Sequence, residues 1–269
     1  MQVIGLCRFS YLGEGGFQIN HETLQERAAF LYAPERLEER FRTFETMTLP
    51  PLRAQTDPDF TFLIVTGDSL PTLAYERLMD LTRGMPQVVV QKHAPENHRG
   101  VMRKAINSVR LFNQDLCAQF RMDDDDAVAC CYVQKLRETV EDVRSLAQKH
   151  RHIAIDYNTG FIARPGPDGL KTTAVNNAYT TAALAIVFRR EVSQTVMNFS
   201  HMKVGRSMPT VTFTGEDMLV RGHNDYNDSR QKTGVKPVKL LPQSPEEEAH
   251  FKKVYNIDAD DVRRVFSAP

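Results

Sequence analysis

The sequence predicts an α/β fold built on an open, mostly parallel sheet. Short apolar runs alternate with amphipathic helical patterns through the first half of the 269 residues, and this alternation stops near residue 150. Strands that alternate with helices form βαβ units with right-handed crossovers, and such units build parallel sheets. Beyond residue 150 the apolar runs are longer and a tight turn joins them, so we expect mixed or antiparallel strands there.

The predicted strands of the first half are its short apolar runs, because a run of this length bounded by turn residues or charges is typical of a buried strand. The second of them, for example, ends at a Thr-Gly-Asp sequence. We predict strands at residues 2–8, 60–65, 87–91 and 116–122.

Helices are predicted between these strands, where apolar residues recur every three or four positions. In the first of them Leu37, Phe41 and Phe44 share one face, and the second is closed by Gly84. We predict helices at residues 34–46, 73–83, 99–112 and 133–148.

The second half has a different pattern. Residues 152–163 and 171–189 are predicted as strands joined by a turn rich in proline and glycine at 164–169. One helix is expected near residues 191–202, and residues 223–248 are polar enough to be predicted as loop. No linker separates the two halves, so we expect a single domain.

The composition gives no support for a nucleic-acid-binding or membrane-spanning protein. The charges balance, with 34 Lys plus Arg and 34 Asp plus Glu, and no basic surface is implied. No run approaches the roughly 20 apolar residues that a membrane span needs, and the N-terminus lacks the layout of a signal peptide. Four cysteines without CxxC spacing indicate buried thiols of a reducing compartment, so we expect a cytoplasmic protein.

The most informative segment is a run of four aspartates at residues 123–126, directly after the predicted strand 116–122. Adjacent negative charges repel one another and destabilise the fold unless a cation neutralises them. A hard divalent ion, Mg²⁺ or Mn²⁺, takes oxygen ligands and leaves positions open for phosphates. We interpret the run as a metal and diphosphate site at the end of a strand. The alternative is a solvated acidic turn that caps the next helix.

The order of the motifs resembles that of glycosyltransferases of the GT-A fold and, more narrowly, the bacterial rhamnosyltransferase family. The resemblance covers roughly residues 3–230. The segments that carry it are Arg8-Phe9-Ser10, PLRAQTD at 51–57, FRMDDDDAV at 120–128, RGHN at 221–224 and NDS at 227–229.

This resemblance implies a GT-A-like nucleotide-binding sheet flanked by helices, with a mixed or antiparallel C-terminal acceptor part. Residues 1–269 would form one domain, in which 1–130 bind the nucleotide-sugar and 131–269 carry the acceptor and catalytic groups. The implied activity is metal-dependent transfer of a sugar, rhamnose by the family's name, from a nucleotide-sugar to a hydroxyl acceptor with inversion. A glycan, a lipid-linked glycan or a polysaccharide would be the acceptor.

The acidic run has two registers for an Asp-x-Asp pair: Asp123 with Asp125, followed by Asp126, or Asp124 with Asp126. The apolar residues that flank the run favour the first register by comparison with similar enzymes. Asp125 is then the metal ligand, Asp123 binds the metal or the ribose, and Asp126 supports them.

The resemblance also implies a site in the second half. Similar enzymes take a further metal ligand from that half, often a histidine, which makes His223 a candidate; the alternative is a surface histidine in a polar loop. Glu216 and Asp217 are candidate general bases, of which Asp217 is favoured by analogy. The alternative for this pair is a helix N-terminus.

Further candidate donor contacts come from the first half. Arg99, Arg103 and Asn107 are four residues apart, so they share a helix face that similar enzymes use to contact the nucleotide; the alternative is a solvated basic face. Arg8 follows the first strand and suits the diphosphate. Asp68 follows the second strand and suits a pyrimidine or ribose, or is an ordinary turn residue.

Two other classes compete with this interpretation. Asp124 and Asp126 followed by Val128 also fit the nucleophile motif of haloacid-dehalogenase-type phosphatases. That motif normally opens the first strand, whereas three predicted strands precede it here. The other alternative is an inactive protein that only binds a nucleotide-sugar, which would show binding without turnover.

Overall fold

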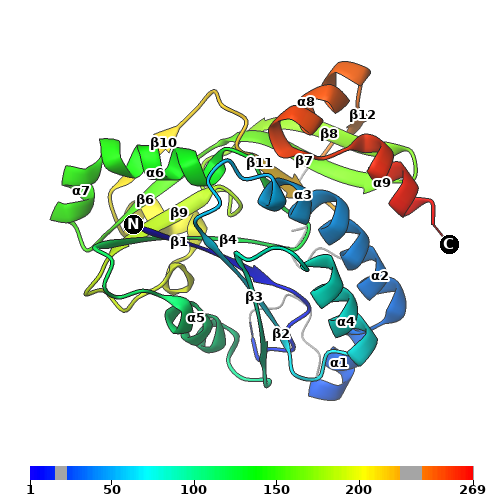
Figure 1. The fold of residues 1–269 in the computed structure, drawn as a ribbon, viewed down its shortest axis with the longest axis horizontal. Coiled ribbons are helices and arrows are strands. Elements are labelled where there is room, and N and C mark those ends of the chain that lie inside the picture. Colours follow the sequence, from blue (N-terminus) through cyan, green and yellow to red (C-terminus); the bar gives the residue numbers. More distant parts are fainter. Residues whose placement is uncertain (16–22, 225–237, 269) are drawn as a thin grey trace.

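The computed structural model describes residues 1–15, 23–224 and 238–268, which form two sheets surrounded by helices (Figure 1). The larger sheet has seven strands within these residues. In order across the sheet they are β10 (Thr210–Phe213), β6 (His152–Tyr157), β9 (Leu184–Arg189), β4 (Leu116–Met122), β1 (Gln2–Arg8), β2 (Thr61–Gly67) and β3 (Val88–His93).

The first half of the chain builds the parallel part of this sheet, as predicted. Strand β1 pairs in parallel with both β4 and β2, and β2 pairs in parallel with β3. Strand β9 then runs antiparallel between β4 and β6, which makes the sheet mixed where the second half joins it. The carboxyl ends of β1, β2 and β4 therefore meet at one edge, the edge at which open α/β sheets bind ligands.

The smaller sheet belongs mostly to the second half. Its described strands are, in order, β12 (Leu241–Pro242), β8 (Gly169–Asn176), β7 (Thr159–Gly166), β11 (Leu219–Gly222) and β5 (Ala127–Val128). Strands β7 and β8 form the predicted hairpin, and Gly169 takes a φ of 101° at its turn, which favours glycine. Because β5 pairs with β11, the segment after the acidic run is fixed against a strand about 90 residues later.

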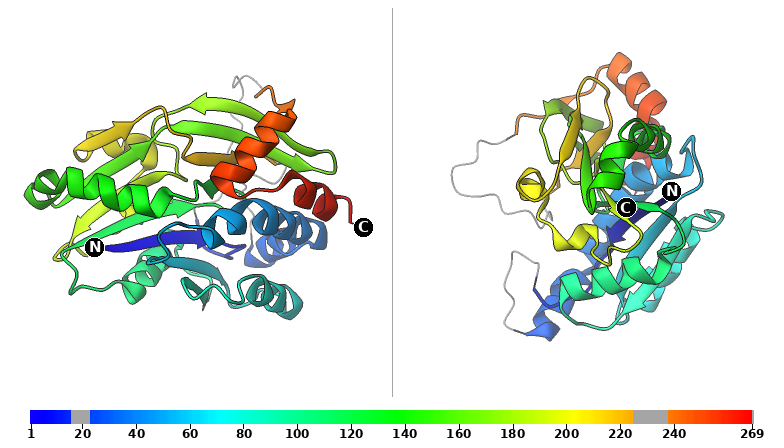
Figure 2. Two further views of the ribbon diagram at one scale, coloured as in Figure 1. Left: turned by 45° about the horizontal axis from the view of Figure 1, so that its top comes forward. Right: turned by 90° about the vertical axis from the view of Figure 1, so that its left-hand side faces the viewer.

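Helices cover both faces of the larger sheet, and Figure 2 shows α5 and α6 on its opposite sides. The described helical segments are α1 (Leu24–Leu31), α2 (Pro34–Thr43), the π-helix η1 (Phe44–Thr48), α3 (Leu49–Arg53), α4 (Thr72–Leu81), α5 (His98–Val109), α6 (Tyr132–Asp142), α7 (Arg144–Lys149), the 3₁₀ turns η2 (Val196–Asn198) and η3 (His201–Arg206), α8 (Pro245–Tyr255) and α9 (Ala259–Phe266).

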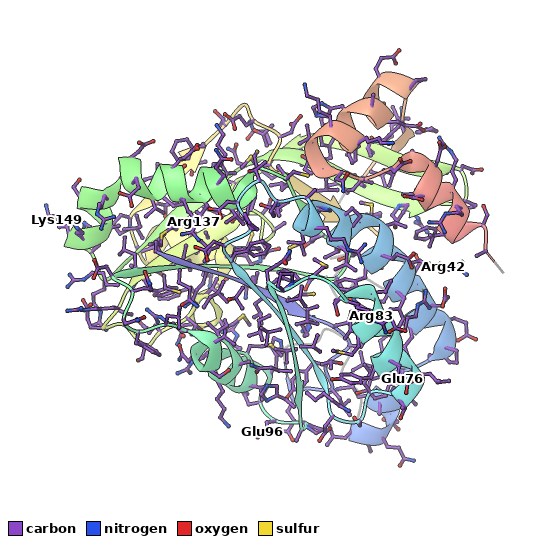
Figure 3. All side chains as sticks on the ribbon, in the orientation of Figure 1. Arg42, Glu76, Arg83, Glu96, Arg137 and Lys149 are labelled. Carbon is purple, nitrogen blue, oxygen red and sulfur yellow. The ribbon has the colours of Figure 1, made fainter. Side chains whose placement is uncertain are left out.

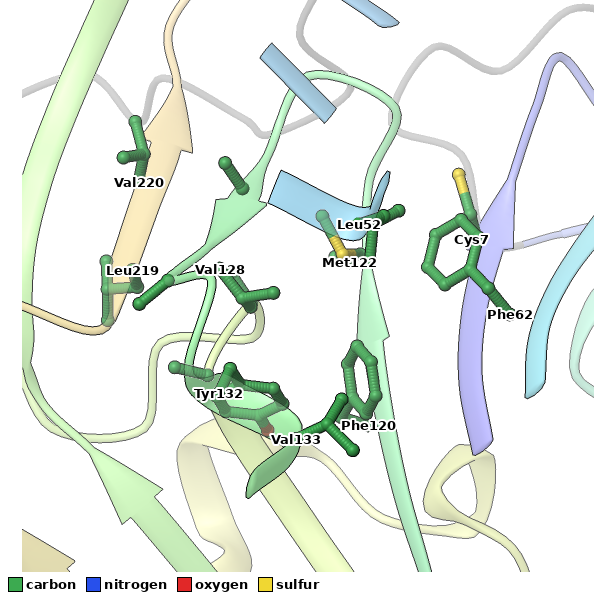
Figure 4. Packing of buried hydrophobic residues seen from close by; sticks show 14 of the residues in the cluster. Cys7, Leu52, Phe62, Phe120, Met122, Val128, Tyr132, Val133, Leu219 and Val220 are labelled. Carbon is green, nitrogen blue, oxygen red and sulfur yellow. The ribbon is translucent and has the colours of Figure 1, made fainter. Parts of the chain in front are cut away.

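One face of the sheet forms the main hydrophobic core. Phe120 and Met122 of β4 and Cys7 of β1 are buried there with Tyr132 and Val133 of α6 (Figure 4). Burial of apolar surface of this kind contributes about 25 cal/mol per Å². This packing fixes the direction in which β4 leaves the sheet, and therefore the position of the acidic run that follows it.

The opposite face carries polar groups toward its carboxyl edge. Leu6 of β1 packs in a second buried cluster with Met102 and Ile106 of α5. Side chains alternate along a strand, so Arg8 shares this face with Leu6. Leu6 is also paired in register with Arg121 of β4. The same face therefore changes from apolar to basic as the strands approach their ends.

The second half differs from the sequence prediction in its boundaries. The predicted strand at 152–163 is two strands, which separate at Asn158 and enter different sheets. The predicted strand at 171–189 is likewise two, with a loop at 177–183. The predicted helix near 191–202 is wrong: η2 and η3 replace it, because Thr195 and Asn198 cap each other and end the turn locally.

Charged side chains lie mostly at the surface; Figure 3 shows Glu96 and Lys149 near the rim of the molecule. Of the residues that the structure describes, none belong to a helix with the length and apolar character needed to cross a bilayer.

Candidate functional site

A cavity of about 590 Å³ opens at the carboxyl edge of β1 and β4. Its volume is in the range of small-molecule sites. Both halves of the chain contribute to its wall. The lining residues are Leu6, Arg8, Arg40, His98, Arg99, Met102, Arg121, Met122, Asp123, Asp125, Asp126, residues 176–181, Met197, His201, Met202, Arg221 and Gly222.

The acidic run forms a tight turn between β4 and β5. The main-chain N–H of Asp126 donates to the carbonyl of Asp123 (3.2 Å), and the main-chain N–H of Asp123 donates to the Asp126 carboxylate (3.1 Å). Thr48 of the π-helix η1 donates its hydroxyl to the carbonyl of Asp126 at 2.8 Å. These bonds fold the run so that three carboxylates face the cavity. Oxygens of Asp123, Asp125 and Asp126 all lie within 4.8 Å of one another.

Asp124 does not belong to this group of three carboxylates. Its carboxylate is fully buried and forms an ion pair with Arg40 of α2. The geometry thus groups Asp123, Asp125 and Asp126, which is the first of the two registers that the sequence left open. The phosphatase motif would need a reactive Asp124, and this ion pair gives that alternative no support.

The Asp124–Arg40 ion pair leads to a stability prediction. We expect Asp124→Asn to lower the free energy of unfolding by about 3 kcal/mol, because Arg40 would stay buried without its carboxylate. Chemical denaturation monitored by circular dichroism measures this. The control is Glu38→Gln: Glu38 pairs with Arg42 and Arg77 at the surface, so its loss should change stability by less than about 1 kcal/mol. Equal effects of the two substitutions would contradict the prediction.

The C-terminal half reaches the acids through β11. The main-chain N–H of Gly222 donates to Asp126 Oδ1 (3.2 Å), and Asn224 Nδ2 donates to Asp125 Oδ2 (2.8 Å). His223, between these two residues, donates its own main-chain N–H to the carbonyl of Ala163 (2.9 Å). The segment meets the acidic run as expected, but the His223 imidazole is not in the group of carboxylates. The neighbouring NDS sequence at 227–229 lies outside the described residues.

Burial and mutual repulsion destabilise the charged forms of these acids. Asp125 and Asp126 are only 6% and 3% exposed. Burial and then the neighbouring carboxylates raise the pKa of both groups, and for Asp125 the rise is large. Oxygen ligands crowded in this way fit a hard divalent cation, which would remove the repulsion and keep the carboxylates ionised. The donor set therefore suits Mg²⁺ or Mn²⁺.

Cationic side chains in the cavity wall outnumber the acids. Among the described residues, five arginines contribute to the wall, against three aspartates. His98 lies among them, with Nε2 3.3 Å from Arg8 Nη1. Burial and the charges of Arg8, Arg121 and Arg99 lower the pKa of His98 to about 3, so it is neutral at pH 7. A wall of this kind attracts a multiply charged anion.

Two of the predicted donor contacts line the cavity: Arg8 and Arg99. The other three lie outside its wall. Asn107 donates to the carbonyl of Ser193 at 3.1 Å and joins α5 to the following loop. Arg103 is on the same helix, about one turn before that contact, and is not among the lining residues, and Asp68 is an exposed turn residue after β2. The alternatives of a solvated helix face and an ordinary turn fit these positions.

The structure does not bring the predicted general bases to the cavity. Asp217 Oδ2 is 2.8 Å from His250 Nε2 on α8, and Glu216 forms a 3.2 Å ion pair with Lys135. Asp217 precedes β11, whereas Gly222 at the other end of that strand contacts the acids. A strand rises about 3.3 Å per residue, so these ends are roughly 16 Å apart. Asp217 and Glu216 therefore lack geometric support as bases.

The sequence reasoning missed several residues of the wall. Arg40 carries no motif, and Arg221 opens the RGHN segment but was given no role; only tertiary contacts bring the two arginines to the acids. The loop at 176–181 was predicted as the interior of a strand. In the structure Asp156 accepts from the main-chain N–H of Tyr179 (3.0 Å), which has a φ of 66°. A positive φ at a tyrosine was not readable from the sequence.

The family described as "Putative rhamnosyl transferase" matches residues 2–236. The chain belongs to this family. The match spans both halves of the cavity wall, from β1 through β11, and agrees with the resemblance that the motifs carry. No curated protein matches the sequence.

Several solved structures are similar to the chain at low sequence identity. S. aureus TarS 1–349 in complex with UDP-GlcNAc is 11% identical, with a TM-score of 0.45, over 85% of this chain and 60% of that chain. A "putative nucleotide-diphospho-sugar transferase" from Desulfovibrio desulfuricans G20 is 12% identical, with a TM-score of 0.36, over 83% and 82%. The chain thus corresponds to about three-fifths of the TarS fragment.

Proposed function

We propose that the protein is a metal-dependent glycosyltransferase that moves a sugar from a nucleotide-sugar to a hydroxyl acceptor. The observation that carries the proposal is the convergence of Asp123, Asp125 and Asp126 at a cavity whose wall also carries arginines. A nucleotide-sugar presents a diphosphate, which is attracted by both a carboxylate-bound cation and guanidinium groups. Membership of the rhamnosyl transferase family supports the same activity.

The residues of the site have separable roles in this proposal. Asp125 and Asp126 are the principal ligands of the cation, and Asp123, which is exposed, completes the group or binds the ribose. The cation supplies Lewis-acid stabilisation of the departing diphosphate. Arg8 and Arg99 balance the remaining negative charge and orient the nucleotide.

The sugar and its acceptor belong on the side of the C-terminal half. Asparagine, tyrosine and threonine side chains of the loop at 176–181 offer the amide and hydroxyl groups that recognise sugar hydroxyls. Rhamnose is the proposed sugar because of the family's description. A glycan, a lipid-linked glycan or a polysaccharide is the proposed acceptor. A cytoplasmic location is part of the proposal, because four free cysteines suit a reducing compartment.

A panel of nucleotide-sugars with and without Mn²⁺ tests the proposal. At least one donor should raise the melting temperature only when metal is present, because a ligand that binds the folded state stabilises it. The same donor should release nucleoside diphosphate on incubation. If no donor does either, the proposal fails. Binding without release in the presence of acceptor mixtures would favour the inactive sugar-binding protein.

Inversion at the anomeric carbon stays part of the proposal. We expect the transferred sugar to have the opposite anomeric configuration from the donor, since a single displacement needs no covalent enzyme intermediate. Proton NMR of the product, recorded before mutarotation or on a glycoside, gives the configuration directly. A retained configuration would rule out the single displacement while leaving the transfer itself intact.

A further inference from the structure

Arg121 is the cationic residue nearest in sequence to the acidic run that has no protein carboxylate of its own. It lies near the end of β4, two residues before Asp123, and lines the cavity. Within the described parts of the chain, its one hydrogen bond is from Nη1 to the sulfur of Met197, at 3.6 Å. A thioether is a weak acceptor and does not neutralise a guanidinium.

Other partly buried arginines of the protein form ion pairs or hydrogen bonds with protein groups. Arg40 is ion-paired with Asp124, and Arg137 with Asp57. Arg110 donates to the main-chain carbonyls of Val192, Arg189 and Gln194 at 2.5, 3.0 and 3.4 Å. Arg121 is therefore not used to hold the structure together in the way that Arg110 is.

Apart from the Asp123 carboxylate, which is itself one of the three grouped acids, the charged groups that act on Arg121 are positive. Leu6 is paired in register with Arg121, and Arg8 lies two residues after Leu6 on the same strand. His98 and Arg99 of α5 line the same cavity. An additional guanidinium here is unfavourable for the protein without ligand, because like charges repel and burial removes hydration. A bound anion would remove this penalty.

We propose that Arg121 binds a phosphate group of the donor's diphosphate, beside the cation held by the acidic run. This deepens the proposed function and rests on it. Arg121 lies near the end of β4 and Asp123 in the turn that follows, and both line the cavity, so they present opposite charges to one ligand. A diphosphate can contact both the cation and the guanidinium, whereas a single carboxylate group would engage one of them.

The experiment uses inorganic pyrophosphate with Mn²⁺ as the probe and compares Arg121→Met with Arg110→Met by calorimetry and thermal melts. Methionine keeps much of the length and apolar volume of the side chain and removes its charge. Without ligand, Arg121→Met should melt at or above the wild-type temperature, because no protein ion pair is lost. Arg110→Met should melt lower, because three carbonyls lose their donor.

The order of the two variants should be reversed when pyrophosphate affinity is measured instead of melting temperature. Arg121→Met should bind Mn²⁺–pyrophosphate about 10- to 100-fold more weakly than wild type, the loss typical of a charge-assisted hydrogen bond. Arg121→Lys should recover part of the affinity, since it restores the charge but not the planar fork. Arg110→Met should bind normally once folded.

Three results would overturn the assignment. One is wild-type affinity for pyrophosphate in Arg121→Met; another is a loss of melting temperature without ligand as large as that of Arg110→Met. The third is a wild-type protein that binds glucuronate, a carboxylate probe, through Arg121 and does not bind pyrophosphate. Pyrophosphate binding that depends on Arg121 in a protein that turns over no nucleotide-sugar would sink the proposed function and leave this inference standing.

Discussion

Asp125→Asn is expected to lower the rate of sugar transfer by at least about 100-fold while the protein still folds. Asp125 is almost fully buried, belongs to the group of three carboxylates and accepts a hydrogen bond from Asn224. An amide oxygen keeps that hydrogen bond but loses the charge that holds the cation. Removing one preorganised electrostatic contact to a developing charge typically costs 10²–10³ in rate. Initial rates at saturating donor and Mn²⁺ measure the effect.

Stability provides the control for this substitution. Asp125→Asn removes one of several crowded negative charges, so in the absence of metal its melting temperature should equal or exceed that of wild type. Asp124→Asn should show the reverse pattern: a clear loss of stability with a milder loss of activity. Full activity of Asp125→Asn, or of wild type in excess chelator, would remove the metal site. A greater activity loss in Asp124→Asn would favour the second register.

The sequence was a good guide to the first half of the fold because that half is periodic. Its strands are short apolar runs and its helices repeat apolar residues every three or four positions, and both patterns depend on local sequence. The prediction for the second half was wrong where one predicted strand is really two strands in different sheets. Asn158 lies in the short polar stretch DYNTG at 156–160, and β6 and β7 diverge there because their partners differ. Sheet membership is a tertiary property that local patterns do not contain.

In the candidate site, too, the features that depend on local sequence were predictable and those that depend on tertiary contacts were not. Four adjacent aspartates after a buried strand were sufficient to predict a group of carboxylates that suits a cation, because their repulsion is visible in the sequence itself. The ion pair that separates Asp124 from the other acids was not visible, since Arg40 is 84 residues away. The base that the analogy places at Asp217 lacks geometric support for a similar reason. Asp217 precedes β11, and the opposite end of that strand, at Gly222, is the one that meets the acids.

Gly222→Ala is expected to disrupt the proposed metal site from outside the acidic run. A methyl group at this position would lie 2.5 Å from both the carboxyl carbon and the main-chain oxygen of Asp125. Such contacts are too short to persist, and one of them is with backbone, so Asp125 or β11 must shift. The hydrogen bond from the Gly222 main-chain N–H to Asp126 would be strained as well. Outer partners of metal ligands typically contribute 10- to 100-fold to metal affinity.

We therefore expect Gly222→Ala to bind Mn²⁺ at least about 10-fold more weakly, with overpacking costing about 1–3 kcal/mol of stability. Titration with Mn²⁺ followed by paramagnetic relaxation of water, together with thermal melts, gives both quantities. Gly166→Ala is the matched control: it is also a strand glycine, on β7, and an added methyl group there meets nothing within 4 Å. If both substitutions leave Mn²⁺ affinity unchanged, the close approach of β11 does not position the acids, and their grouping must depend on the turn at 123–126 alone.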